Sequence, residues 1–187
     1  MKKVLLIATL ASLPLTTALA ADYDIDPSHT YANFAVSHLG FSTMRGRINS
    51  SSGSLQYDAA AKQASVRIEL DAASIDTGHE KRDAHLKSPD FLNVVENPTI
   101  SFESTAVTWN GDKPATATGN LTMLGVSKPV TLTFTSVNCG PHPFSKKEMC
   151  GFDATASIKR TDFGVNYGVP AIGEVLELWI EAEAYKK

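Results

Sequence analysis

The chain has 187 residues, of which 43% are hydrophobic and 20% are charged, and its formal net charge is −3 at pH 7. This length is ample for one domain with a sizeable core, and no repeat or low-complexity linker divides it. The acidic balance argues against nucleic acid as a partner, because binding to phosphates requires a surplus of lysine and arginine.

The start of the chain has the organisation of a secretory signal peptide. Two lysines precede an apolar run from Val4 to Leu15, and Ala18-Leu19-Ala20 places small residues at the two positions that determine cleavage. The run is shorter than the roughly 20 apolar residues of a membrane-spanning helix. We therefore expect a signal peptide at 1–20, cleavage near Ala20-Ala21, and one exported domain at 21–187 without stable membrane insertion.

Alternation of apolar and polar residues predicts β-strands over most of the remaining chain. At 130–135, valine, leucine and phenylalanine alternate with threonine, so one face of this strand is apolar. About eight or nine such strands, joined by short turns, can cover their apolar faces in a closed antiparallel barrel or a two-sheet sandwich, and periodicity does not choose between these. Segments that favour strands lie at 23–26, 31–38, 41–48, 54–57, 66–70, 99–109, 117–123, 130–135, 152–159 and 176–181.

A charged stretch interrupts these strands. Residues 79–92 are compatible with a helix, Asp76 or Thr77 can cap its start, and Pro98 prevents its continuation into the next strand. Because so many charges cannot be buried unpaired in a small core, the stretch must lie at a rim or on an outer face. We expect one or two short helical turns that act as a lid or brace.

Cys139 and Cys150 are the only cysteines of the chain. In an exported protein we expect them to form a disulfide that braces the connection between two strands and takes no part in ligand chemistry. His142 is the only imidazole nearby and the spacing is not C-x-x-C, which argues against a metal site. The sequence also lacks a glycine-rich loop for a nucleotide, so we expect no metal and no cofactor.

Histidines on the charged stretch are the first candidates for catalysis. His79 and His85 are six residues apart, which on an α-helix places their side chains about 120° from each other and does not suit a shared metal ion. Neither G-x-S-x-G nor S-x-x-K occurs after residue 20. We therefore expect a protein that is not an enzyme and assign no catalytic residue. The alternative that stays open is an enzyme for a small substrate, with His38, His85 or Asp83 as acid or base.

The apolar strand faces leave two options for the inside of a barrel. An eight-stranded barrel is of a size that side chains can fill or that can hold one small ligand. The sequence permits a pocket, but the same faces suit an ordinary packed core. A packed barrel would serve as an interaction module, for instance as a homodimer anchored by Trp109 or Trp179.

Short motifs follow one another in order from residue 25 to residue 165. They are IDPSH at 25–29, VSHLG at 36–40, RG at 45–46, the stretch from SIDT to RDAHLKSPDFL at 74–92, PTISF at 98–102, GNLT at 119–122, GVSKPV at 125–130 and IKRTDFGV at 158–165. Each motif is short, but through their number and order the chain resembles the YceI family.

The resemblance to YceI proteins implies a lipocalin-like antiparallel β-barrel with a helical element. It also implies export to the periplasm and an elongated apolar interior that binds a polyisoprenoid or a similar amphiphile, such as an isoprenoid quinone or a polyprenyl lipid. No catalytic residue comes with the family. Cys139 and Cys150 are not part of the general family pattern, which indicates a subgroup.

A lipid-binding barrel needs a dry interior for the tail, since each methylene removed from water contributes roughly 0.8 kcal/mol, and a few polar groups at its mouth for the head. Candidates for the head are His38, Arg45 and Arg160, at strand ends or bends, with ordinary salt-bridged or solvated roles as the alternative. The residues expected to contact the tail are Phe34, Val36, Phe41, Ile68, Leu70, Phe91, Ile100, Phe102, Met123, Leu132, Phe134, Phe152 and Leu178.

Overall fold

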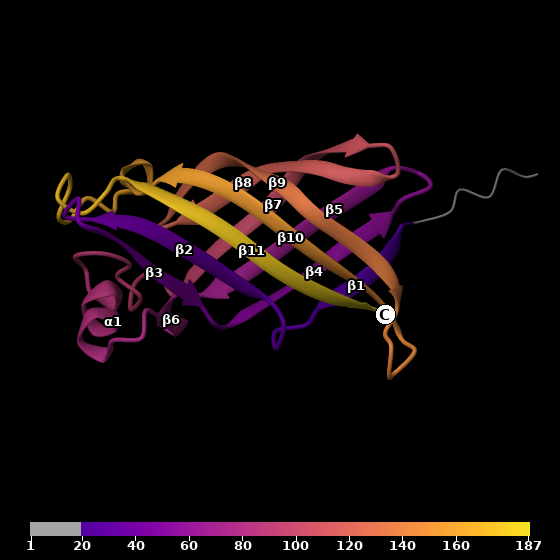
Figure 1. Cartoon of the computed structure of the whole chain (residues 1–187), viewed down its shortest axis with the longest axis horizontal. Coiled ribbons are helices and arrows are strands. Elements are labelled where there is room, and N and C mark those ends of the chain that lie inside the picture. Colours follow the sequence, from indigo (N-terminus) through magenta and orange to yellow (C-terminus); the bar gives the residue numbers. More distant parts are fainter. Residues whose placement is uncertain (1–19) are drawn as a thin grey trace, which may run out of the picture.

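Residues 20–187 are described in the computed structural model, and they form a closed antiparallel β-barrel of eight strands (Figure 1). The ring closes because its first strand pairs with β4 on one side and with β11 on the other. Of the two architectures that alternation allowed, the protein therefore adopts the barrel. Apart from Ala20, the predicted signal peptide lies outside the described residues. In order around the ring, the strands are β1 (Ala21–Ile25), β4 (Ser51–Asp58), β5 (Gln63–Asp71), β7 (Thr99–Asn110), β8 (Lys113–Met123), β9 (Val126–Pro141), β10 (Glu148–Lys159) and β11 (Val175–Lys186).

At one end of the barrel, three further strands extend the wall beyond β11. They are β2 (Tyr31–His38), β3 (Ser42–Ile48) and β6 (Ile75–Asp76), which pair in that order. Strands β1 and β2 run one after the other along β11, with β2 opposite residues 177–181. Because a turn at 26–30 separates them, β1 can pair with β4 while β2 pairs with β3.

The charged stretch forms one α-helix, α1 (Glu80–Lys87), beside β6 at the same end of the barrel (Figure 1). None of its residues is fully buried, as expected of an element at a rim. The N-cap is His79, whose Nδ1 accepts the main-chain N–H of Arg82 at 3.3 Å. Within residues 20–187, no helix has the length and apolar character that crossing a bilayer would require.

The prediction that Asp76 or Thr77 caps this helix was wrong because both side chains have other partners. Asp76 belongs to β6, and its carboxylate accepts the N–H of Gly78 at 2.7 Å. Thr77 donates its main-chain N–H and its hydroxyl to Asp83, and it accepts a hydrogen bond from Arg82 Nε at 2.7 Å. The first turn of α1 is thereby tied to the segment that leads out of the barrel.

Cys139 and Cys150 form the predicted disulfide, with an S–S distance of 2.05 Å. They lie opposite each other within β9 and β10, so they are inside the strands and not in the connection between them. Strand β9 is 16 residues long and extends well beyond the predicted 130–135. Its second half was missed because pairing of the main chain with β10 continues there, where the side chains no longer alternate regularly.

Candidate functional site

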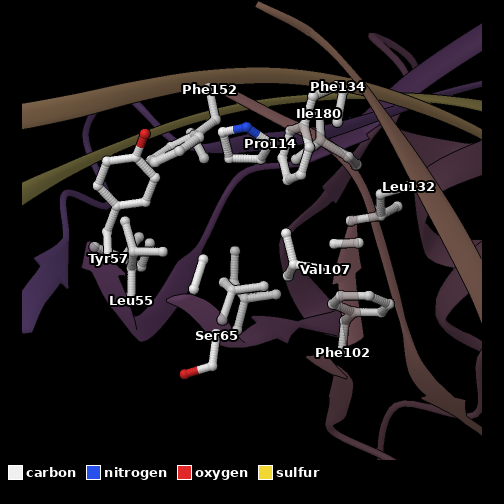
Figure 2. Close-up of a pocket in the computed structure, with 17 residues that line it drawn as sticks. Leu55, Tyr57, Ser65, Phe102, Val107, Pro114, Leu132, Phe134, Phe152 and Ile180 are labelled. Carbon is white, nitrogen blue, oxygen red and sulfur yellow. The ribbon is translucent and has the colours of Figure 1, made fainter. Parts of the chain in front are cut away.

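Two cavities lie in line inside the barrel. The larger has a volume of about 210 Å³ and is bounded at the α1 end by Leu86, Phe91 and Leu92. The smaller has a volume of about 70 Å³ and lies toward β1 and β4, where Ile25 and Leu55 line it (Figure 2). Both therefore occupy the space enclosed by the apolar faces of the strands.

Four residues line both cavities, and we call them the waist. Ile68 and Phe102 are direct neighbours across β5 and β7, whereas Leu132 comes from β9 and Ile180 from β11. Figure 2 shows Phe102, Leu132 and Ile180 together at one end of the smaller cavity. Because the two cavities share these walls, the interior is one elongated tract that is narrow in its middle.

The walls of the larger cavity are almost entirely hydrocarbon. Among the described residues that line it, only Tyr31, Asn33 and Arg160 carry polar side-chain groups, and the Asn33 amide donates to the carbonyl of Trp179 at 3.2 Å. This cavity is larger than the about 150 Å³ of an engineered apolar cavity that stays dry and binds benzene. A polar ligand would lose its hydrogen bonds to water here, whereas a hydrocarbon chain gains from leaving water.

Nearly all of the residues that alternation placed inside the barrel line one of these cavities. Strand periodicity located all of them except Phe91, because every second residue of a strand in the barrel wall points inward, whereas Phe91 lies in a turn after α1. Contact with a ligand remains a prediction for each of them. The larger cavity is lined by Phe34, Val36, Ile68, Leu70, Phe91, Ile100, Phe102, Met123, Leu132 and Leu178, and the smaller by Phe134 and Phe152 together with Ile68, Phe102 and Leu132.

Phe41 is the exception, and its assignment to the interior was wrong. Its side chain is 92% exposed, in the turn between β2 and β3. Leu39 and Gly40 have φ angles of 54° and 73°, and the N–H of Phe41 donates to the carbonyl of His38 at 3.0 Å. The predicted strand began one residue too early, and the alternation of β3 also directs position 41 outward, on the side of the exposed Arg45 and Arg47.

Of the three residues predicted for a ligand head, only Arg160 lines a cavity. Its side chain is 3% exposed and donates to the carbonyl oxygens of Val165, Ile172 and Gly173 at 2.7 to 2.9 Å. Burial lowers the pKa of this guanidinium, and the charge of Glu174 opposes that effect. Arg160 therefore holds the loop at 164–174 against the barrel.

The other two predicted head residues lie outside the cavities. His38 is half-buried at the end of β2, where it pairs with Ile172, and Arg45 is exposed in β3. The structure therefore does not gather the three side chains around the large cavity. A role of His38 or Arg45 in ligand binding remains a prediction.

An aromatic cluster closes the α1 end of the larger cavity. The rings of His85, Phe91 and Tyr167 lie with their centroids 5.0 to 5.1 Å apart. His85 also pairs through Nε2 with Asp90 Oδ2 at 2.7 Å. Because Tyr167 belongs to the 164–174 loop, the cluster joins that loop to the segment around α1.

The side chains proposed for acid-base catalysis have separate partners. His85 pairs with Asp90, Asp83 accepts hydrogen bonds from Thr77, and among residues 20–187 no hydrogen bond joins either of them to His38. Their arrangement is that of a helix anchor and an aromatic contact. In the described part of the chain, His38, Asp83 and His85 are therefore not joined in one hydrogen-bonded group.

The tryptophans proposed as anchors of a dimer are both half-buried. Trp109 stacks on Tyr57 with ring centroids 5.9 Å apart, and Tyr57 lines the smaller cavity. Trp179 lies in β11, opposite Thr155 and Asn33. Trp109 thus packs onto its own barrel, and a homodimer remains a prediction.

A polar cluster that the sequence did not reveal fixes the turn between β1 and β2. His29 Nδ1 lies 2.8 Å from Asp26 Oδ2 and 3.7 Å from Glu183 Oε2. The hydrogen bond with Asp26 and the nearby acidic charges raise the pKa of His29. Burial acts to raise the pKa of Asp26, but hydrogen bonds from His29 and Ser28 hold it below its usual value. Because Glu183 is far away in the sequence, no local motif could have indicated this cluster.

Sequence reasoning also missed several residues that line the larger cavity. Leu121, Leu176 and Ile180 follow the same alternation as the residues it found, so the signal was present. Val165 and Ile172 belong to the 164–174 loop, in which apolar and polar residues do not alternate regularly. Only the fold shows that this loop covers the cavity.

The chain is similar to proteins of one family. A family model described as a YceI-like domain matches residues 23–184. The protein YceI of Salmonella arizonae is 40% identical over 192 residues, with 100% of each chain covered. A YCEI protein of Campylobacter jejuni has a TM-score of 0.68 at 27% identity and covers 81% of this chain and 90% of its own. A polyisoprenoid binding domain from Saccharophagus degradans has the same TM-score at 14% identity, covering 91% of this chain and 100% of its own, which shows a common fold.

Proposed function

Because this chain belongs to the family of YceI-like domains, we propose that it binds a long-chain isoprenoid, such as an isoprenoid quinone or a polyprenyl lipid, and carries it through water. The observation that carries the proposal is the line of two apolar cavities along the barrel. The Saccharophagus degradans neighbour, which is named as a polyisoprenoid binding domain, supports the same class of ligand.

The shape of the interior favours a chain over a compact ligand. The waist of Ile68, Phe102, Leu132 and Ile180 separates the two cavities. A flexible isoprenoid chain, whose widest points are its methyl branches, can pass between these side chains and occupy both cavities, whereas a rigid fused ring system would stop at them. Each methylene that enters gains roughly 0.8 kcal/mol, so a ligand that fills both cavities binds more tightly than one that fills the larger alone.

The proposal includes a periplasmic location. Its support is the pattern of lysines, apolar residues and small residues in 1–20, which is typical of an exported protein. An aqueous compartment between two membranes is a setting in which a water-insoluble lipid requires a soluble carrier.

The test is mass spectrometry of an organic extract from the purified protein, followed by titration of the stripped protein with a polyprenol. We expect a co-purified lipid with a long hydrocarbon chain and uptake of the polyprenol. A protein that folds without lipid and takes up no polyprenol would rule the function out.

A matched pair of variants places the lipid inside the barrel. Leu178 lines the larger cavity and Glu177, next to it in β11, is exposed. Leu178→Trp takes space from several methylenes, so its affinity for polyprenol should fall roughly tenfold or more. Glu177→Trp adds the same ring outside and should leave the affinity unchanged. Equal affinities in folded variants would mean that the lipid binds elsewhere.

A further inference from the structure

Two exposed loops form one surface at the α1 end of the barrel. The turn between β2 and β3 meets the 164–174 loop, where Leu39 N–H donates to the carbonyl of Ala171 and Gly173 N–H donates to that of Ser37, both at 2.8 Å. Figure 1 shows both loops at the end opposite the β9–β10 hairpin. We call their exposed apolar residues the apical ridge: Leu39, Phe41, Tyr167, Val169, Pro170 and Ala171.

The apical ridge is apolar although it faces solvent. Phe41 is 92% exposed and Leu39 is 52% exposed. Neither residues 39–43 nor residues 163–173 include an Asp, Glu, Lys or Arg, in a chain of which 20% is charged. Protruding aromatic and aliphatic side chains without charges suit the boundary between head groups and acyl chains of a bilayer.

The apical ridge is continuous with the wall of the larger cavity. Val165 and Ile172 line that cavity and belong to the 164–174 loop, and Val36 lines it from β2, the strand that leads into the ridge. Ile172 pairs with His38, one residue before the ridge begins at Leu39. A lipid that moved between a bilayer and the cavity at this point would meet hydrocarbon on both sides.

We propose that the apical ridge is a membrane-docking surface with which the barrel rests on a lipid bilayer. The ridge has six residues, whereas each side of a stable protein interface contributes about 20–30, so a bilayer fits it better than a second copy of the chain. Exchange of a ligand between the docked protein and the bilayer rests on the proposed function. Docking of the ridge on the bilayer does not depend on that function.

The experiment is flotation of the lipid-stripped protein with vesicles of phosphatidylethanolamine and phosphatidylglycerol. The variant Phe41→Ser, Val169→Ser removes two apolar side chains of the ridge. Phe144 is 90% exposed in the β9–β10 hairpin at the other end of the barrel, so Phe144→Ser is the matched control. The wild type and the control should float equally, and the ridge variant should partition about tenfold more weakly or worse.

Each other outcome overturns the proposal. Equal flotation of all three proteins, or an equal loss in the control, would show that the ridge has no special affinity for the bilayer. A self-association that sedimentation detects in the wild type and that the ridge variant loses would assign the ridge to a second copy of the chain.

Uptake of polyprenol delivered from cyclodextrin separates docking from the proposed function. We expect the ridge variant to take up the lipid as the wild type does, because Phe41 and Val169 do not line the cavities. Vesicle binding without uptake would leave docking standing and remove the carrier function. Uptake without vesicle binding would leave the carrier function standing and rule out docking.

Discussion

A buried arginine holds the loop that covers the larger cavity. The guanidinium of Arg160 donates to Val165, Ile172 and Gly173, and its main-chain N–H donates to the carbonyl of Glu174. A planar group with donors in a fixed fork can reach several carbonyls at once, which an ammonium on a flexible stem cannot. Arg160 therefore lies beside the apolar cavity because its guanidinium binds the carbonyls of the 164–174 loop that covers the cavity.

Arg160→Met should lower the free energy of unfolding by about 3 kcal/mol, because one buried and two partly buried carbonyl oxygens lose a charged donor. Arg45→Met is the control: Arg45 is exposed in β3, so this change should stay within about 0.5 kcal/mol. Urea denaturation of the lipid-free proteins measures both. A stable Arg160→Met variant with wild-type unfolding would show that the arginine does not anchor the loop.

At the scale of elements, the closure of the cavity depends on segments that are distant in the sequence. The ring of His85 in α1 meets Phe91, just after the helix, and Tyr167 of the 164–174 loop edge to face, and the rings of Phe91 and Tyr167 are tilted against each other. Leu86 of α1 also lines the cavity. No residue of α1 is fully buried. An element with so little buried surface is held mainly by contacts at its edges and opens more easily than the barrel strands.

His85→Ala removes the ring that touches both Phe91 and Tyr167, and we expect release of bound polyprenol to become about tenfold faster, since such aromatic contacts contribute about 0.5–1.5 kcal/mol each. His85→Phe keeps the ring and loses only the bond to Asp90, so its release rate should stay near that of the wild type. Stopped-flow transfer to acceptor vesicles measures the rates. Equal rates in all three proteins would contradict a closing role of the cluster.

The strands and the short helix between β6 and β7 were predictable from the sequence, whereas the cap of that helix and the place of the 164–174 loop were not. The alternation of apolar and polar residues located Phe34 and Phe102, because every second side chain of a strand points to the same face of the sheet. The helix cap was misassigned because Thr77 and Asp83 bind each other, a choice between competing partners that no single position reveals. Ile172 was missed because its contact with the cavity depends on how the chain returns from β10 to β11.

At the scale of the whole molecule, the barrel has two ends with different packing. One core cluster includes Leu92 and Phe163 at the α1 end, and the other includes Tyr23, Cys150 and Ala184, where β1 closes the ring. The disulfide belongs to the second cluster, at the end of the smaller cavity. Its contribution to stability should therefore be separable from lipid binding in the larger cavity.

The variant Cys139→Ala, Cys150→Ala should fold, retain lipid and lose less than about 3 kcal/mol of unfolding free energy. Pairing of β9 with β10 remains, and Pro141 and Pro143 already restrict the unfolded loop. Alanine is used because Cys150 is completely buried and a hydroxyl there would lack a partner. Urea denaturation, extraction of lipid and thiol titration of the untreated wild type check these points. Free thiols in the wild type, or lipid loss in a folded variant, would contradict them.

Among residues 20–187, most of the outer edge of β3 stays unpaired beside the closed ring. Strand β3 pairs with β2 along its length, but on its other side β6 covers only Arg47 and Ile48. The main chain at 42–46 could therefore template a strand from another copy and start a fibril. Arg45 and Arg47 stand exposed on this short strand, and like charges repel when two copies approach edge to edge. Arg45, first considered for a ligand head, thus places a positive charge on the part of this edge that β6 leaves unpaired.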